Sequence, residues 1–165
     1  MSKVGEGIVV KVGDLQEELA YFYHNYDGFP GAKLSQEESV AYFKVACDKG
    51  RVVACTEATG KLLGYCESWR IGYEQLGRIV ANEPFNIKDE DIETGKICYV
   101  FNVTVHPDFR QGYVMEYLVS QFFTQNFMCD YFIGQARRKK HQPLKVFKRQ
   151  EFYDKYIHRY SKGVK

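Results

Sequence analysis

The chain has 165 residues, enough for one domain with a sizeable core, and its content of 45% hydrophobic and 16% aromatic residues excludes intrinsic disorder for most of its length. Its 23 basic and 21 acidic residues give a net charge of +2, but residues 1–136 hold 12 basic and 19 acidic residues while residues 137–165 hold 11 and 2. The basic C-terminal end either neutralises the acidic body in the fold or indicates an anionic partner, such as a nucleotide phosphate, a nucleic acid or an acidic protein.

The cysteines and histidines indicate neither a disulfide scaffold nor a metal site. Five cysteines lie far apart, at positions 47, 55, 66, 98 and 129, without a C-x-x-C pair, and the four histidines have no ligand spacing. We therefore expect reduced, mostly buried thiols and no metal. No run approaches the roughly 20 apolar residues of a membrane span, and the first residues lack the apolar core of a signal peptide, so we expect a cytoplasmic protein.

The first half of the chain predicts a strand, two helices and a hairpin. The β-branched run 8–12 predicts a strand, and Asp14 caps a helix whose apolar face recurs at helical spacing up to Tyr26. Ser35 with Glu38 forms a capping box for a second helix that stops at Gly50. Two strand-like runs, 51–57 and 61–70, flank a turn at residues 58–60.

The second half predicts a strand–helix–strand crossover and a closing pair of elements. Residues 71–95 have no clear period and indicate a long loop or irregular insert. A strand over 97–105, a helix indicated by Val114, Leu118, Phe122 and Gln125, and a strand over 128–133 follow. A last helix begins at Pro143 and a last strand covers 152–157. The order β-α-α-β-β-β-α-β-α-β predicts a single α+β domain, residues 1–165, with a mixed α/β sheet flanked by helices.

Two segments of the chain resemble the GNAT superfamily of acyl-CoA N-acyltransferases. The segment 103–110, VTVHPDFR, leads into an amphipathic helix, as in that family's strand ending in Val-x-Pro-x-Tyr/Phe-Arg before a pyrophosphate loop. The segment 144–152, LKVFKRQEF, is similar to the family's late Leu-Tyr-x-x-x-Gly-Phe segment, and the order of elements agrees over nearly the whole chain. The resemblance implies a GNAT-like central mixed sheet and an N-acetyltransferase that uses acetyl-CoA as co-substrate without a metal.

The resemblance also implies which residues hold acetyl-CoA. A pyrophosphate suits the unpaired N–H groups at a helix N-terminus, and the pantetheine arm can bond the exposed backbone of a strand. Tyr113 and Met115 stand where the family has glycine or alanine, and Gly112 lies one place early. The cofactor-binding residues implied are Val103, Thr104, Val105, Arg110, Gln111, Gly112, Tyr113, Val114 and Met115. The basic residues 137–140 are either a solvated turn or a site for the CoA 3′-phosphate or a nucleic acid.

The catalytic positions depart from the family pattern. Acetylation of an amine needs a base for the ammonium proton and an acid for the leaving thiolate. Phe147 stands where the family has the tyrosine that serves as general acid. Tyr113, Tyr131 and Tyr153 are the candidates to replace it, and none of them is supported by spacing. Glu67, on the hairpin, is the candidate base, with a solvated strand carboxylate as the alternative reading.

Three functions follow from these features. The first is direct acetyl transfer from acetyl-CoA to a small-molecule or protein amine, because no cysteine occupies an evident nucleophile position. The second is a GNAT-fold protein with weakened catalysis that acts as a binding or inhibitory module, which the residues at 113, 115 and 147 favour. The third is a nucleic-acid-binding protein that uses its basic C-terminal end. The sequence leaves the acceptor and the oligomeric state open.

Overall fold

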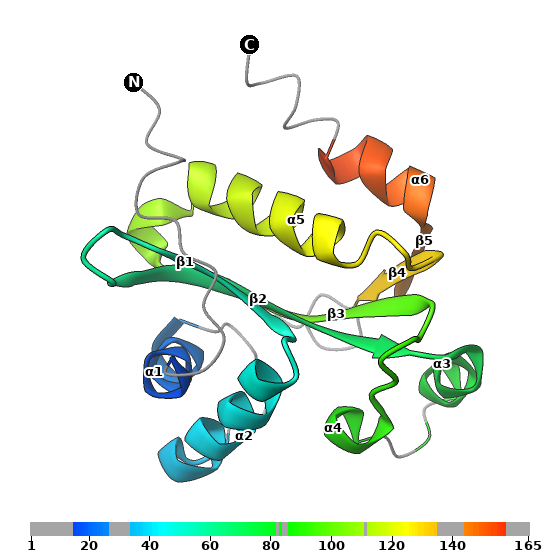
Figure 1. Ribbon diagram of the computed structural model, residues 1–165, viewed down its shortest axis with the longest axis horizontal. Helices are drawn as coiled ribbons and strands as arrows, with labels where there is room; N and C mark the ends of the chain where they lie inside the picture. Colours follow the sequence, from blue (N-terminus) through cyan, green and yellow to red (C-terminus); the bar gives the residue numbers. More distant parts are fainter. Residues whose placement is uncertain are drawn as a thin grey trace.

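A computed structural model gives the structure of residues 15–26, 34–81, 83, 86–110, 112–134 and 144–157. Their centre is a five-stranded sheet in the order β1-β2-β3-β4-β5, with helices on both faces (Figure 1). All neighbouring strands are antiparallel except β3 and β4, which are parallel. The predicted α+β class, with a mixed sheet flanked by helices, is therefore confirmed.

Two N-terminal helices cover one face of the sheet. Helix α1 spans Gln16–Tyr26, and helix α2 spans Gln36–Asp48. The predicted capping box is present: the Glu38 N–H donates to Ser35 Oγ at 3.1 Å, and the Ser35 N–H donates to Glu38 Oε1 at 3.3 Å. The predicted strand over 8–12 and the predicted cap at Asp14 lie outside the described residues.

The hairpin and the central strand form where the sequence predicted them. Strand β1 is Val52–Thr56, strand β2 is Leu62–Ile71 and strand β3 is Ile97–Val105. Gly60 in the hairpin turn has a φ of +92°, a conformation that glycine adopts without strain. The pairing shifts between Glu67 and Ser68, which leaves Phe101 as the extra residue of a bulge in β3.

The segment between β2 and β3 is more regular than predicted. It contains helix α3, Tyr73–Val80, and the short helix α4, Ile87–Glu90, so the expectation of an irregular insert over 71–95 was wrong. Helix α3 has no fully buried residue, but Leu76 and Ile79, three residues apart on one helix face, pack against the hydrophobic core, so an apolar stripe was an available signal for it. A buried ion pair fixes the end of this segment, because Arg51 donates to both Asp91 oxygens at 3.0 and 2.8 Å.

This ion pair is expected to stabilise the fold measurably. Asp91 also accepts from the Arg70 N–H at 3.0 Å, so one carboxylate joins β1, β2 and the segment after α4. We expect Asp91→Asn to lower the free energy of unfolding by about 1.5–3 kcal/mol, the usual value of hydrogen bonds to charged groups. Urea denaturation measures this change. Glu93→Gln is the control, because that carboxylate also contacts Arg51 but is 80% exposed, and we expect a change within about 0.5 kcal/mol.

The crossover after β3 was predicted correctly, but the last two elements were not. Helix α5 is Tyr113–Gln125, and strand β4 is Tyr131–Gly134. The predicted helix through Leu144 and Phe147 is instead strand β5, Lys145–Lys148, paired antiparallel with β4. The open edge of β4 and the strand-forming Val146 and Phe147 outweigh the helix-starting proline before them.

The predicted closing strand over 152–157 is helical. Helix α6, Arg149–Phe152, continues as a π-helical segment, Tyr153–Ile157. Phe152 is buried and stacks on Phe132 of β4, with ring centroids 4.7 Å apart. This packing holds the segment over the same face as α5 rather than at the sheet edge (Figure 1).

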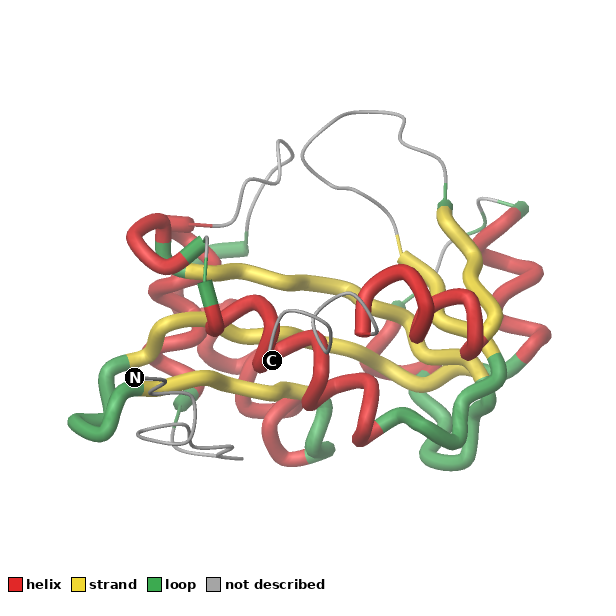
Figure 2. The backbone as a smooth tube through the Cα atoms, turned by 90° about the horizontal axis from the view of Figure 1, so that it is seen from above, coloured by secondary structure: helices red, strands yellow, loops and turns green. Residues whose placement is uncertain are grey.

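The sheet separates two apolar layers. One lies between the sheet and helices α1 and α2 and includes Trp69, Tyr65 and Phe43. The other lies between the sheet and helices α5 and α6 and includes Leu118, Phe122 and Phe132. Figure 2 shows the strands side by side beneath the helices of this second layer. None of the helices in the described part of the chain has the length and apolarity that crossing a bilayer requires.

Candidate functional site

Strands β3 and β4 pair over only part of their length. Their parallel register runs from Ile97 opposite Tyr131 to Val100 opposite Gly134 and ends there. Strand β3 continues for five more residues to Val105, and among the described residues no strand pairs with this edge of it. Gly134 is the last described residue of β4, so the splay between these two strands stays a prediction, and it would leave backbone groups of β3 open to an extended ligand.

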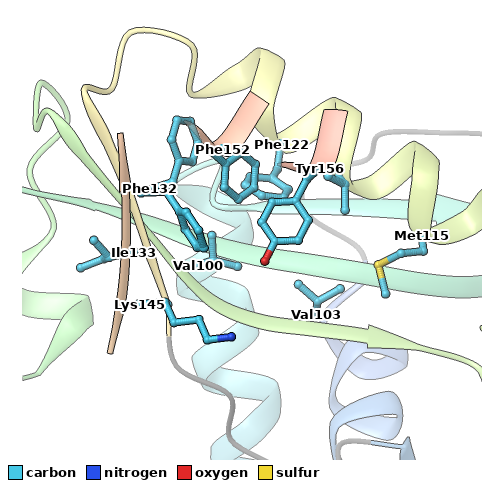
Figure 3. Close-up of a pocket in the computed structure, with 12 residues that line it drawn as sticks. Val100, Val103, Met115, Phe122, Phe132, Ile133, Lys145, Phe152 and Tyr156 are labelled. Atoms are coloured by element: carbon cyan, nitrogen blue, oxygen red, sulfur yellow. The ribbon is translucent and has the colours of Figure 1, made fainter. Parts of the chain in front are cut away.

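A cavity of about 430 Å³ begins at the point where this pairing ends (Figure 3). Its walls are almost entirely apolar and come from the sheet, from α5 and from the β5–α6 segment. The lining residues are Val100, Val103, Met115, Val119, Phe122, Phe132, Ile133, Gly134, Lys145, Phe147, Phe152 and Tyr156.

Two polar side chains reach this cavity. Figure 3 shows the Tyr156 hydroxyl pointing into the space between α6 and Val103, and the exposed Lys145 lies at the rim. The Tyr156 ring lies next to Phe147, with centroids 5.8 Å apart. Phe147 itself lies on β5 and contributes only a ring to the wall, so the phenol nearest to it is that of Tyr156.

The N-terminus of α5 lies beside this cavity. Gly112, the residue before the helix, has no side chain to cap the first N–H groups, and among the described residues nothing lies within 4 Å of where a Gly112 side chain would begin. Free N–H groups at the start of a 13-residue helix suit a phosphate. Glu116 in the first turn works against this, because its carboxylate adds negative charge.

The residues that replace the family's glycines pack into the α5 layer. Tyr113 and Met115 both contact the second apolar layer, and Met115 lines the cavity. Val114 is buried, and Gly64 of β2 gives it room: a side-chain carbon at Gly64 would lie 3.1 Å from Val114 Cγ1. The predicted residue Gln111 lies outside the described residues.

The remaining predicted binding residues differ in position: one lines the cavity, two are buried in the fold, and one makes hydrogen bonds to the backbone. Val103 lines the cavity, whereas Thr104 and Val105 are buried. The Arg110 guanidinium donates to two backbone carbonyls, that of Val105 at 3.1 Å and that of Tyr26 at 3.3 Å. In this structure Arg110 therefore ties the end of β3 to α1.

Glu67 lies in the other apolar layer and does not line the cavity. Its carboxylate has no exposed surface, and it accepts hydrogen bonds from the Tyr42 hydroxyl and from Trp69 Nε1. Asn102 Nδ2 donates to its other oxygen at 3.4 Å. Asn102 pairs with Glu67 across the sheet and lies two residues from Val100, so this carboxylate is one strand away from the point where the β3–β4 pairing ends.

The five cysteines are free and buried, as predicted. Burial raises the pKa of Cys55 to about 11 and also raises the pKa values of Cys66, Cys98 and Cys129. A thiol needs its thiolate form to act as a nucleophile, so these four are poorly suited to carry an acyl group. Within the described ranges, no three His, Cys, Asp or Glu side chains are grouped to hold a metal ion.

The buried thiols are expected to make the fold less stable in alkali. The folded chain keeps the Cys55 proton up to a pH of about 11, whereas the unfolded chain loses it near pH 8.5. Between these values the unfolded state binds fewer protons, so the free energy of unfolding falls by about 1.4 kcal/mol per pH unit for each such thiol. Urea denaturation under reducing conditions at pH 8 and pH 10 measures this. Cys55→Ala should reduce the slope, and equal slopes would contradict this role for Cys55.

Tyr156 was not among the tyrosines that the sequence suggested. Of those, Tyr153 packs on Phe123 at 5.8 Å between ring centroids, and neither it, Tyr113 nor Tyr131 lines the cavity. The spacing of Phe152 and Tyr156 was an available signal. Aromatic residues four apart lie on one helix face, and these two rings are 4.8 Å apart between centroids.

Solved structures with this arrangement are acetyltransferases and related proteins. The chain matches yncA, a putative acetyltransferase from Salmonella typhimurium with its cofactor acetyl-CoA, at 13% identity and a TM-score of 0.52 over 79% of this chain and 70% of that one. It matches mosquito arylalkylamine N-acetyltransferase like 5b at 14% identity and a TM-score of 0.50, over 78% and 74%. It matches the GphF GNAT-like decarboxylase in complex with isobutyryl-CoA at 13% identity and a TM-score of 0.50, over 94% and 70%.

These likenesses show the GNAT fold. The chain spans 61% of the length of another match, the loading GNATL domain of CurA from Lyngbya majuscula, at a TM-score of 0.49. No protein-family model matches the sequence, and no curated protein matches it. The resemblance to the GNAT superfamily seen in the sequence is thus confirmed at the level of the fold.

Proposed function

We propose that the protein transfers an acyl group from an acyl-CoA, with acetyl-CoA as the simplest donor, directly to an amine. The observation that carries this proposal is the end of the β3–β4 pairing in the described part of the chain, at Val100 and Gly134, beside the N-terminus of α5. An open strand edge suits the amides of a pantetheine arm, and the free helix N–H groups suit a pyrophosphate. The acetyl-CoA of yncA and the isobutyryl-CoA of GphF, two proteins with this fold, support the choice of ligand.

The chain offers a proton donor for the leaving group. In acyl transfer the amine nitrogen bonds to the thioester carbon, the carbon–sulfur bond breaks, and the thiolate takes up a proton. The Tyr156 hydroxyl faces the cavity and can give this proton, which it recovers from solvent after the product leaves. We assign this role to Tyr156 in place of the tyrosines that the sequence suggested.

Glu67 is kept as the base, acting through Tyr42. Its carboxylate is closed to solvent, but the half-buried Tyr42 donates a hydrogen bond to it. A proton from the ammonium of the acceptor would pass to the Tyr42 oxygen while the Tyr42 proton passes to Glu67. Tyr42→Phe interrupts this path without removing the ring.

Calorimetric titration with CoA and with acetyl-CoA at moderate salt tests the proposal. The proposal predicts that one molecule of CoA or of acetyl-CoA binds per chain. It also predicts release of CoA thiol when a panel of primary amines is added with acetyl-CoA. Absence of binding by either ligand would overturn it.

A second candidate is a GNAT-fold protein that binds a ligand or partner without transfer. It is favoured by Glu116 in the first turn of α5 and by Arg110, whose guanidinium is engaged by backbone carbonyls. Both features weaken a phosphate site. Binding of acetyl-CoA without thiol release for any amine would select this candidate. The basic residues 137–140, expected to be either a solvated turn or a site for the CoA 3′-phosphate or a nucleic acid, lie outside the described residues.

A further inference from the structure

We infer that the donor carries an apolar acyl chain longer than acetyl, of about four to eight carbons, an inference that rests on the proposed acyl transfer. The position of the cavity is the first argument. It starts at Val100 and Gly134, where the thioester would lie under the proposed function, and extends from there between the sheet and the helices (Figure 3).

The chemistry of the walls is the second argument. Beyond the starting point, the surfaces come from Val119 and Phe122 of α5, from Phe132 and Ile133 of β4, and from Phe152 of α6. Among the described residues that line it there is no carboxylate, amide or Ser/Thr side chain, and their two polar groups are those of Lys145 and Tyr156. Water finds few partners against such walls, so an apolar occupant is favoured.

The aromatic end of the cavity is the third argument. The rings of Phe122, Phe132 and Phe152 meet there, with centroid separations of 6.2, 4.7 and 5.6 Å. All three are buried, and Figure 3 shows them together on the side away from Met115. Packed aromatic rings make a firm floor, which sets an upper limit on chain length.

The volume is the fourth argument. A methyl group is about as large as a water molecule, whose share of liquid volume is about 30 Å³. The methyl of an acetyl group therefore fills a small part of the 430 Å³, and the end of a pantetheine arm at Val103 and Met115 leaves space for several methylene groups. Each buried methylene should tighten binding about fourfold.

Calorimetry with CoA and with acetyl-, butyryl-, hexanoyl- and octanoyl-CoA tests the inference. We expect Kd to fall about fourfold per methylene from acetyl- to hexanoyl-CoA and then to level off or rise. Val119→Phe, which narrows the cavity, should remove this gain, so that the four thioesters bind with nearly equal Kd values. Val80→Phe is the matched control, because Val80 lies on α3, is 67% exposed and is not among the lining residues. Thermal unfolding checks that both variants fold.

The wild-type series is decisive even if Val119→Phe does not fold. Equal Kd values for CoA and all four thioesters, or a Kd that rises from acetyl-CoA onward, would overturn the inference and leave the proposed acyl-CoA site standing. Failure of CoA and every thioester to bind would overturn the proposed function and this inference with it.

Discussion

Replacing Glu67 by leucine is expected to lower the free energy of unfolding by about 3–5 kcal/mol. The Glu67 carboxylate is the common acceptor for Tyr42, Trp69 and Asn102, and Trp69 has no exposed surface. Leucine fills similar space but leaves these donors without their acceptor, and each buried donor left unsatisfied costs about 1–3 kcal/mol. Urea denaturation monitored by Trp69 fluorescence measures the effect directly at the network.

Two further variants define the cause. Glu67→Gln keeps one acceptor oxygen, but its NH₂ group faces some of the donors that the carboxylate bonded. We therefore expect a smaller loss in the free energy of unfolding, about 1–2 kcal/mol. Glu57→Leu, at the turn of the same hairpin, is the matched control and should change stability by less than about 0.5 kcal/mol. If Glu67→Leu unfolds as the wild type does, the carboxylate does not hold this network together. If Glu67→Gln folds and still transfers acyl groups at the wild-type rate, Glu67 is not the base.

Replacing Tyr156 by phenylalanine is expected to slow acyl transfer by about 10²-fold while leaving the Kd of acetyl-CoA within twofold. General acid catalysis contributes roughly 10²–10⁴ to a rate, and a thiol with a pKa near 8.5 leaves fairly well unaided, which favours the lower value. Binding should persist because the ring, which contacts Phe152 and Phe147, is retained. Thiol release in single-turnover experiments with the best amine of a panel measures the rate.

Tyr153→Phe is the matched control for Tyr156→Phe. It removes a hydroxyl from the same π-helical segment, but Tyr153 packs on Phe123 and does not line the cavity, so a rate within twofold of wild type is expected. Equal rates for Tyr156→Phe and wild type would exclude Tyr156 as the proton donor. A loss of rate in Tyr153→Phe instead would return the role to a residue that the sequence had suggested.

The elements that were predicted correctly are those that depend on local sequence signals. The Ser35–Glu38 capping box, the Gly60 turn and the β-branched strand 97–105 are local signals, and all three are present in the structure. The crossover from β3 into α5 also followed, since the turn after Val105 leads directly into the helix. Segments whose structure depends on distant partners were misread. Strand β5 exists because β4 offers an edge, and α6 is held by the ring of Phe132.

The candidate site was predicted in its backbone but not in its side chains. The strand edge and the helix N-terminus come from one continuous motif, residues 103–115. The apolar cavity instead needs residues from α5, β4, β5 and α6 at once, and the last two of these elements were predicted with the wrong secondary structure. For that reason Tyr156 was missed, and Phe147 suggested a missing acid although a phenol lies next to its ring.

Hydrogen–deuterium exchange with and without saturating CoA tests most directly whether the cleft between β3 and β4 holds an acyl-CoA. Peptides that cover residues 101–105 and residues 113–116 report on the open strand edge and on the start of α5. The account predicts slower exchange in both peptides when CoA is present, with little change in the hairpin turn around Gly60. Unchanged exchange in both peptides at saturating CoA, or protection confined to other parts of the chain, would contradict it.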